Sequence, residues 1–132
     1  MELTYNGGAI SKVLININSD EIFVTDTFEH AARYANAQTS GTVDPDATEL
    51  KSGVVLEIEP TSELVWHKRP ENHSTLDVCE SWLLDNAFVI KAAYIKFTEY
   101  KNTVYGNQQT GYKNKEQVIA FLESKNIKVI EL

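Results

Sequence analysis

Short apolar stretches separated by polar loops run along most of the chain, a pattern typical of strands. Residues 54–59 alternate between apolar and polar side chains in their later part, and Pro60 ends the stretch. Residues 3–5 begin a similar alternation, which runs into Asn6-Gly7-Gly8, where we expect a turn or a loop of close backbone approach. Residues 13–17 are apolar and β-branched, which favours a strand but also allows a short helix. Further strands are predicted at residues 22–25, 88–97 and 127–132, and residues 64–66 are expected to form a short strand or a bend.

Two segments show helical spacing instead. In the first, Asp26 and Glu29 have the spacing of a capping box, and the apolar residues form one stripe: Phe28, Ala31, Ala32 and Ala35. Tyr34 lies on the flank of that stripe. The second helix is predicted at residues 115–124, with Asn126 ending it in the left-handed conformation. Many short strands with few helices, and no regular βαβ alternation, predict an α+β fold with a mostly antiparallel sheet.

Length and composition indicate a single domain. The chain has 132 residues, 42% of them hydrophobic and 23% charged, close to the averages for globular proteins. A loop at residues 102–112 separates a core from a C-terminal helix and strand at residues 113–132. The single cysteine, Cys79, excludes an internal disulfide, and no stretch approaches the ~20 apolar residues that span a bilayer. Because no signal peptide is visible, we expect a cytoplasmic protein with no membrane association.

The charge of the chain is acidic and unevenly distributed. The net charge of −7 argues against nucleic-acid or anionic-membrane binding. Residues 1–66 carry 11 acidic and 3 basic side chains, whereas residues 67–132 carry 8 acidic and 9 basic ones. The acidic half is suited to a protein partner with a basic surface, and it also has the simpler interpretation of solubilising charge. The oligomeric state is not indicated.

Several common sites are not supported by the sequence. Gly7-Gly8 is too short to be a phosphate-binding loop of the P-loop or dinucleotide type. His67 and His73 precede Cys79, but this spacing does not predict a metal site. A nucleophilic Cys79 is disfavoured by the neighbouring Glu80, because a negative charge raises a thiol pKa.

Four segments, in their order and spacing, resemble the ADP-ribosyltransferase-like family. Residues 22–35 look like its strand-to-helix motif, in which an aromatic-apolar-Thr strand end runs into a helix of the form "A..YA". Residues 5–8 look like its first-strand motif. Residues 53–60 are most similar to the rifampin ADP-ribosyltransferases, where a comparable strand also ends in Glu-Pro. Glu80 matches an acidic residue that opens a later strand in that group. The resemblance covers residues 3–97 and implies a split sheet.

The resemblance implies a mono-ADP-ribosyltransferase that transfers ADP-ribose from NAD to an unidentified acceptor. NAD would be the substrate from which nicotinamide leaves through an oxocarbenium-like transition state. Glu80 would be the catalytic carboxylate that holds a ribose hydroxyl and stabilises the developing positive charge. Asn6 would contact the ribose or a phosphate, and Gly7 would let the main chain approach the ligand closely.

Three more residues complete the implied NAD site. Phe23 and Tyr34 would offer aromatic surface to the nicotinamide, and Thr25 would supply a supporting hydroxyl. The chain departs from the family at two positions, because Asn6 replaces the usual His or Arg and Phe23 replaces the usual tyrosine. An alternative is therefore a non-catalytic protein-binding module, an inhibitor or adaptor, on the same fold and acting through its acidic surface.

Overall fold

The computed structural model describes residues 3–8, 10, 13, 17–18, 21–40, 44, 46–61, 66–68, 79–84, 88–97 and 115–132. The strands are β1 (Thr4–Gly8), β2 (Glu21–Thr25), β3 (Gly53–Pro60), β4 (Trp66–Lys68), β5 (Cys79–Leu84), β6 (Phe88–Lys96) and β7 (Lys128–Glu131). The helices are α2 (Phe28–Ser40) and α4 (Lys115–Ser124).

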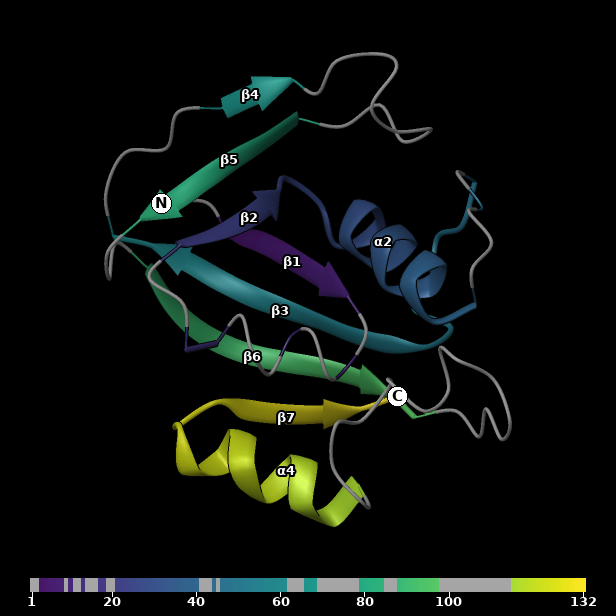
Figure 1. Cartoon of the computed structure of the whole chain (residues 1–132), viewed down its shortest axis with the longest axis vertical. Helices are drawn as coiled ribbons and strands as arrows, with labels where there is room; N and C mark the ends of the chain where they lie inside the picture. The colour runs from purple at the N-terminus through teal and green to yellow at the C-terminus, as the bar shows by residue number, and fades with distance from the viewer. Residues whose placement is uncertain are drawn as a thin grey trace.

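The strands form one twisted sheet in the order β4-β5-β2-β1-β3-β6-β7 (Figure 1). Every neighbouring pair is antiparallel except β6 and β7, which run parallel. The predicted α+β class with a mostly antiparallel sheet is therefore confirmed. The expected split into two sheets is not found, because hydrogen bonding continues through β1 and β2. That junction is narrow, however: β1 pairs with β2 only at Tyr5 and Thr25, but with β3 along its whole length.

The predicted turn at residues 6–8 is wrong, because all three belong to β1 and pair with β3. The glycine at position 7 has a packing reason instead. A Cβ on Gly7 would lie 1.8 Å from the carbonyl oxygen of Ala31, so α2 crosses β1 with its backbone against the strand. Gly53, which opens β3, has a φ of +93°, a conformation that favours glycine. Both glycines therefore serve the close approach of helix and sheet rather than chain reversal.

The two faces of the sheet bury different cores. On one face, α2 packs its small residues against β3 in a cluster of Ala31, Ala32, Ala35, Leu50 and Val55. On the other face, α4 and residues 10 and 13 cover a larger core: Ile10, Val13, Ile22, Val24, Val54, Leu56, Ile58, Ala93, Ile95, Val118, Leu122 and Ile127. Because side chains alternate along β3, α2 and α4 lie on opposite faces. Figure 1 shows α2 beside β1 and β3, and α4 beside β7.

Polar side chains of α2 hold the chain that leads into β3. The Asn36 amide donates to the carbonyl oxygen of Glu49 (3.0 Å), and its oxygen accepts from the N–H groups of Lys51 (2.7 Å) and Ser52 (3.2 Å). One helical turn earlier, Arg33 Nε donates to a carbonyl oxygen of the same segment. These bonds satisfy main-chain groups that neither helix nor sheet pairs.

Two local predictions need correction, and two helix-end predictions hold. Residues 10 and 13 are helical, and the Ile17 N–H donates to the Val13 carbonyl. Of the two alternatives for residues 13–17, the described residues therefore support the short helix rather than the strand. The cap of α2 is Thr27 rather than Asp26, since Thr27 Oγ1 accepts from the N–H three residues later. The bounds of α4 match the prediction, and Asn126 has the expected positive φ of 61°.

Candidate functional site

Five of the six predicted site residues lie on three neighbouring strands, and the sixth, Tyr34, lies on α2. Asn6 is on β1, Phe23 and Thr25 are on β2, and Glu80 is on β5, in the sheet order β5-β2-β1. The register pairs Glu80 directly with Thr25, and Thr25 directly with Tyr5. The fold therefore brings the main chain at Glu80 and Thr25 side by side, although 55 positions separate them in sequence.

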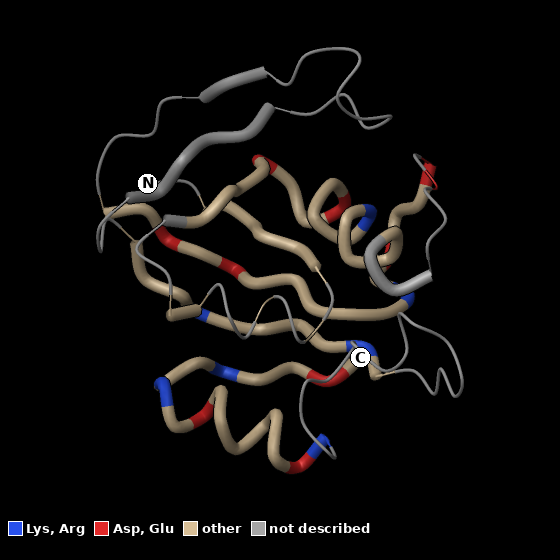
Figure 2. The backbone as a smooth tube through the Cα atoms, viewed as in Figure 1, with Lys and Arg blue, Asp and Glu red and all other residues tan. Residues whose placement is uncertain are grey.

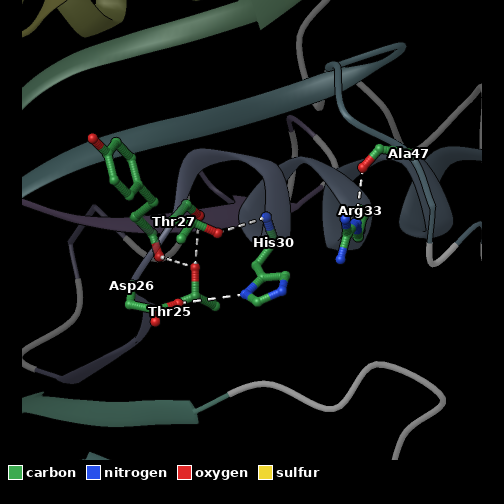
Figure 3. Close-up of polar contacts among 7 residues, drawn as sticks. Thr25, Asp26, Thr27, His30, Arg33 and Ala47 are labelled. Atoms are coloured by element: carbon green, nitrogen blue, oxygen red, sulfur yellow. Dashed lines mark hydrogen bonds and ion pairs between the residues drawn. The ribbon is translucent and has the colours of Figure 1, made fainter.

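Thr25 ends β2 at the junction with α2. It is 3% exposed, and its Oγ1 lies 3.0 Å from the carbonyl oxygen of Thr27 and 3.5 Å from that of Tyr5. The hydroxyl therefore donates to the main chain that turns from strand to helix, as Figure 3 shows. In this arrangement Thr25 fixes the geometry of the junction rather than presenting a free donor.

Asn6 lies on the face of β1 opposite to Tyr5, the face that packs on the larger core. Its register partner is Leu56, and it is 8% exposed. The Asn6 amide donates to the carbonyl oxygen of Phe23 over 2.7 Å, and its Oδ1 has no hydrogen-bond partner among the described residues. The amide thus bridges β1 and β2 where their main-chain pairing is missing. The Asn6 side chain and Thr25 do not converge on one side of the sheet.

The other predicted contacts with NAD differ in accessibility. Gly7 lies beneath α2, and the helix backbone fills the space that its missing side chain leaves. Phe23 is 41% exposed, on the same face of β2 as Thr25. Tyr34 is half-buried on α2, and its hydroxyl oxygen is enclosed. Of these residues, Phe23 is the exposed one.

A polar and aromatic cluster next to this site was not singled out from the sequence. Tyr5 pairs with Glu57 on β3, and Tyr94 on β6 donates a 3.1 Å hydrogen bond from its hydroxyl to Glu57 Oε2. The Phe28 ring meets both tyrosines edge-on, with centroid distances of 6.1 Å to Tyr5 and 5.3 Å to Tyr94. The one sequence signal that could have indicated this cluster was Glu57, a carboxylate within the otherwise mostly apolar strand β3. Tyr94 lies 37 positions further on, so only the register could join the two.

Both tyrosine hydroxyls stay protonated over a wide pH range. Burial raises the pKa of Tyr94, and its hydrogen bond to Glu57 and the negative charge there raise it further. Burial also raises the pKa of Tyr5, with additional contributions from the charges of Glu57 and Glu29. The Tyr94 hydroxyl therefore donates to Glu57 as a neutral phenol.

The first turn of α2 adds polar groups at the edge of the site. His30 Nδ1 lies 3.4 Å from Asp26 Oδ1, and Arg33, one turn further, donates to the Ala47 carbonyl (Figure 3). Among the described residues, no group of three or more His, Cys, Asp or Glu side chains could hold a metal ion. Neither described helix is long and apolar enough to cross a membrane.

Comparison of the chain with protein-family models, curated proteins and solved structures found no match.

Proposed function

We propose that the chain is a mono-ADP-ribosyltransferase, which transfers ADP-ribose from NAD to an acceptor that is not yet identified. The glycosidic bond between nicotinamide and C1′ of the ribose breaks, and the acceptor nucleophile forms a new bond to C1′ and loses its proton. Nicotinamide leaves as a neutral molecule. The proposed role of Glu80 is to hold a ribose hydroxyl and to stabilise the positive charge that develops at C1′.

The observation that carries the proposal is the placement of the implied residues on adjacent strands. Glu80 on β5 is the direct register partner of Thr25 on β2, and β1 with Asn6 is next in the sheet. Strands far apart in the sequence need not be neighbours, so this arrangement supports the resemblance from which the roles were taken. Phe23, exposed on β2 two residues from Thr25, is the aromatic surface proposed for the nicotinamide ring.

Asn6 has an internal contact in this arrangement. Its amide is bonded to the Phe23 carbonyl, and its side chain faces the larger core. It would therefore act by joining β1 to β2 beneath the nicotinamide surface, rather than by touching the ribose. In the same way, Gly7 would support the position of α2 instead of approaching NAD. The proposed direct contacts are thus reduced to Glu80, Phe23 and Tyr34.

The alternative function is a non-catalytic protein-binding module on the same fold. Three residues that the resemblance implies as NAD contacts, Asn6, Gly7 and Thr25, are used in internal contacts instead. This structural use favours the binding module. The two functions differ in one readout, which is whether nicotinamide is released.

The deciding experiment measures nicotinamide release from NAD and label transfer to lysate proteins. Wild type is compared with Glu80→Gln, which keeps the shape but removes the charge, and with Glu49→Gln, an exposed control outside the sheet. We expect both signals in wild type and in the control, and a loss of at least about 100-fold with Glu80→Gln. Phe23→Tyr, at an exposed position, restores the family hydroxyl and should raise the rate. The transferase proposal is wrong if wild type releases no nicotinamide, transfers no label and shows no rise in melting temperature at millimolar NAD. The binding module would then be the remaining function.

A further inference from the structure

Glu57 is a carboxylate in the middle of the sheet that has no positive partner in the part of the chain that the structure describes. It is half-buried between Tyr5 on β1 and Ala92 on β6, its two register partners. The Tyr94 hydroxyl donates to Oε2 over 3.1 Å, whereas Oε1 accepts no hydrogen bond and no cation lies within ion-pair distance among the described residues. Figure 2 shows the red of the β3 carboxylates amid strands that are mostly tan.

Two other carboxylates on described strands of the sheet have cationic partners, although neither is more enclosed. Glu59, two residues further along β3, pairs with Lys91 at 3.6 Å, and Glu131 pairs with Lys115 at 3.0 Å. Enclosing a charge without a counter-charge costs free energy, since the lost hydration is not replaced. An unpaired, half-buried carboxylate on a central strand is therefore suited to a cation supplied from outside.

The surroundings of Glu57 are aromatic and apolar. The Tyr5 and Phe28 rings, edge to face, border it on one side. Two residues further along β3, Glu59 pairs with Val89 of β6, whose side chain is 48% exposed. Leu3, directly before β1, is 36% exposed. We call this surface the Glu57 face, defined by Leu3, Tyr5, Glu57, Glu59 and Val89. α2 packs over Gly7 and Val55, and its first residue, Phe28, meets the Tyr5 ring at the border of this face.

We infer that the Glu57 face binds an arginine side chain of a protein partner, with the guanidinium on the Glu57 carboxylate beside the Tyr5 ring. Arginine fits better than lysine, because its planar, weakly hydrated guanidinium both pairs with carboxylates and stacks on aromatic rings. Its aliphatic stem and flanking apolar residues would cover Val89 and Leu3. The net charge of −7 favours approach of a basic segment. This surface is independent of the proposed transfer reaction.

Two further features support the assignment. The pKa of Tyr5 is raised by burial and then by the charges of Glu57 and Glu29, so two carboxylates act on the same hydroxyl. The Tyr94 hydroxyl holds Oε2 of Glu57, which orders the carboxylate before any ligand arrives and reduces the entropy lost on binding. Tyr94 is therefore a positioning residue, and Glu57 is the contact residue.

The test uses three short peptides that differ at one position, with arginine, lysine or the neutral isostere citrulline between two leucines. Binding is followed by two-dimensional NMR titration of the full chain at low salt. We expect the arginine peptide to bind about tenfold more tightly than the citrulline peptide, equivalent to about 1.4 kcal/mol. The largest amide shifts should fall at Tyr5, Glu57 and Tyr94.

Matched variants make the outcome decisive. Glu57→Gln should bring the arginine-to-citrulline ratio to about one, whereas Glu49→Gln, at an exposed site outside the sheet, should leave it unchanged. Tyr94→Phe should lower the ratio only partly, with circular dichroism confirming that each variant is folded. Lysine binding as tight as arginine, an unchanged ratio with Glu57→Gln, or no binding by wild type would overturn the inference. Glu80→Gln should retain peptide binding, so failure of the transfer reaction and failure of this site are distinguishable.

Discussion

Replacement of Gly7 by alanine should destabilise the fold through a clash with helix backbone. The new Cβ would lie 1.8 Å from the Ala31 carbonyl oxygen and 2.6 Å from the carbonyl carbon. An ordinary contact is at least about 3.4 Å, so α2 would have to retreat by roughly 1.6 Å. That retreat would separate fully buried alanines from Val55. Overpacking of this kind costs about 3 kcal/mol or more, against a gain of about 0.5–1 kcal/mol from removing glycine from a strand.

Equilibrium urea unfolding followed by circular dichroism measures this cost. We expect the midpoint to fall with an unchanged m-value, and the melting temperature to drop by about 12 °C. Because the obstacle is a carbonyl group, trimming the Ala31 side chain should not help. The double variant Gly7→Ala with Ala31→Gly should therefore be no more stable than Gly7→Ala alone. A near-neutral Gly7→Ala, or rescue by Ala31→Gly, would refute the reasoning.

Three further predictions concern the polar contacts of the fold. Asn36→Ala should cost about 2–4 kcal/mol, since it leaves the N–H groups of Lys51 and Ser52 unpaired. Hydrogen exchange at these two amides should accelerate, and unchanged protection would contradict the proposed contact. Thr27→Ala should cost about 1 kcal/mol in urea unfolding through loss of the α2 cap, whereas Thr27→Ser should cost little. Because the pKa of Tyr94 is raised in the fold, stability should decline as the pH rises above 10, and less so in Tyr94→Phe.

The elements with strong periodicity were predictable from the sequence, and the elements set by tertiary contacts were not. Helix α4 and strand β3 were predicted with nearly the bounds they have, because each carries a regular apolar pattern of its own. Asn6-Gly7-Gly8 has the composition of a turn, yet it is strand, because α2 needs a glycine beneath it. Nothing within residues 6–8 encodes the approach of a helix that begins twenty residues later.

The candidate site was predictable at the level of strands but not at the level of side-chain direction. The order of the motifs assigned Asn6, Thr25 and Glu80 to different strands, and the sheet makes those strands neighbours. Which face each side chain occupies depends on the register, and a shift of one residue reverses every assignment. Tyr5 rather than Asn6 shares its row with Thr25, and Glu57 continues that row on β3. No local pattern in β1 distinguishes these two registers.

Side-chain hydrogen bonds complete the junction between β1 and β2. Main-chain pairing between them is limited to Tyr5 and Thr25, and side chains make the remaining contacts: Asn6 bonds to the Phe23 carbonyl and Thr25 to the turn that follows. The buried Asn6 amide takes the place of a missing main-chain donor at 2.7 Å. The resemblance implies a histidine or arginine at this position, whereas Asn6 of this chain joins β1 to β2. Any transfer activity must then rely on β2 and β5, whereas the Glu57 face, on the other side of β1, keeps its carboxylate available for a partner.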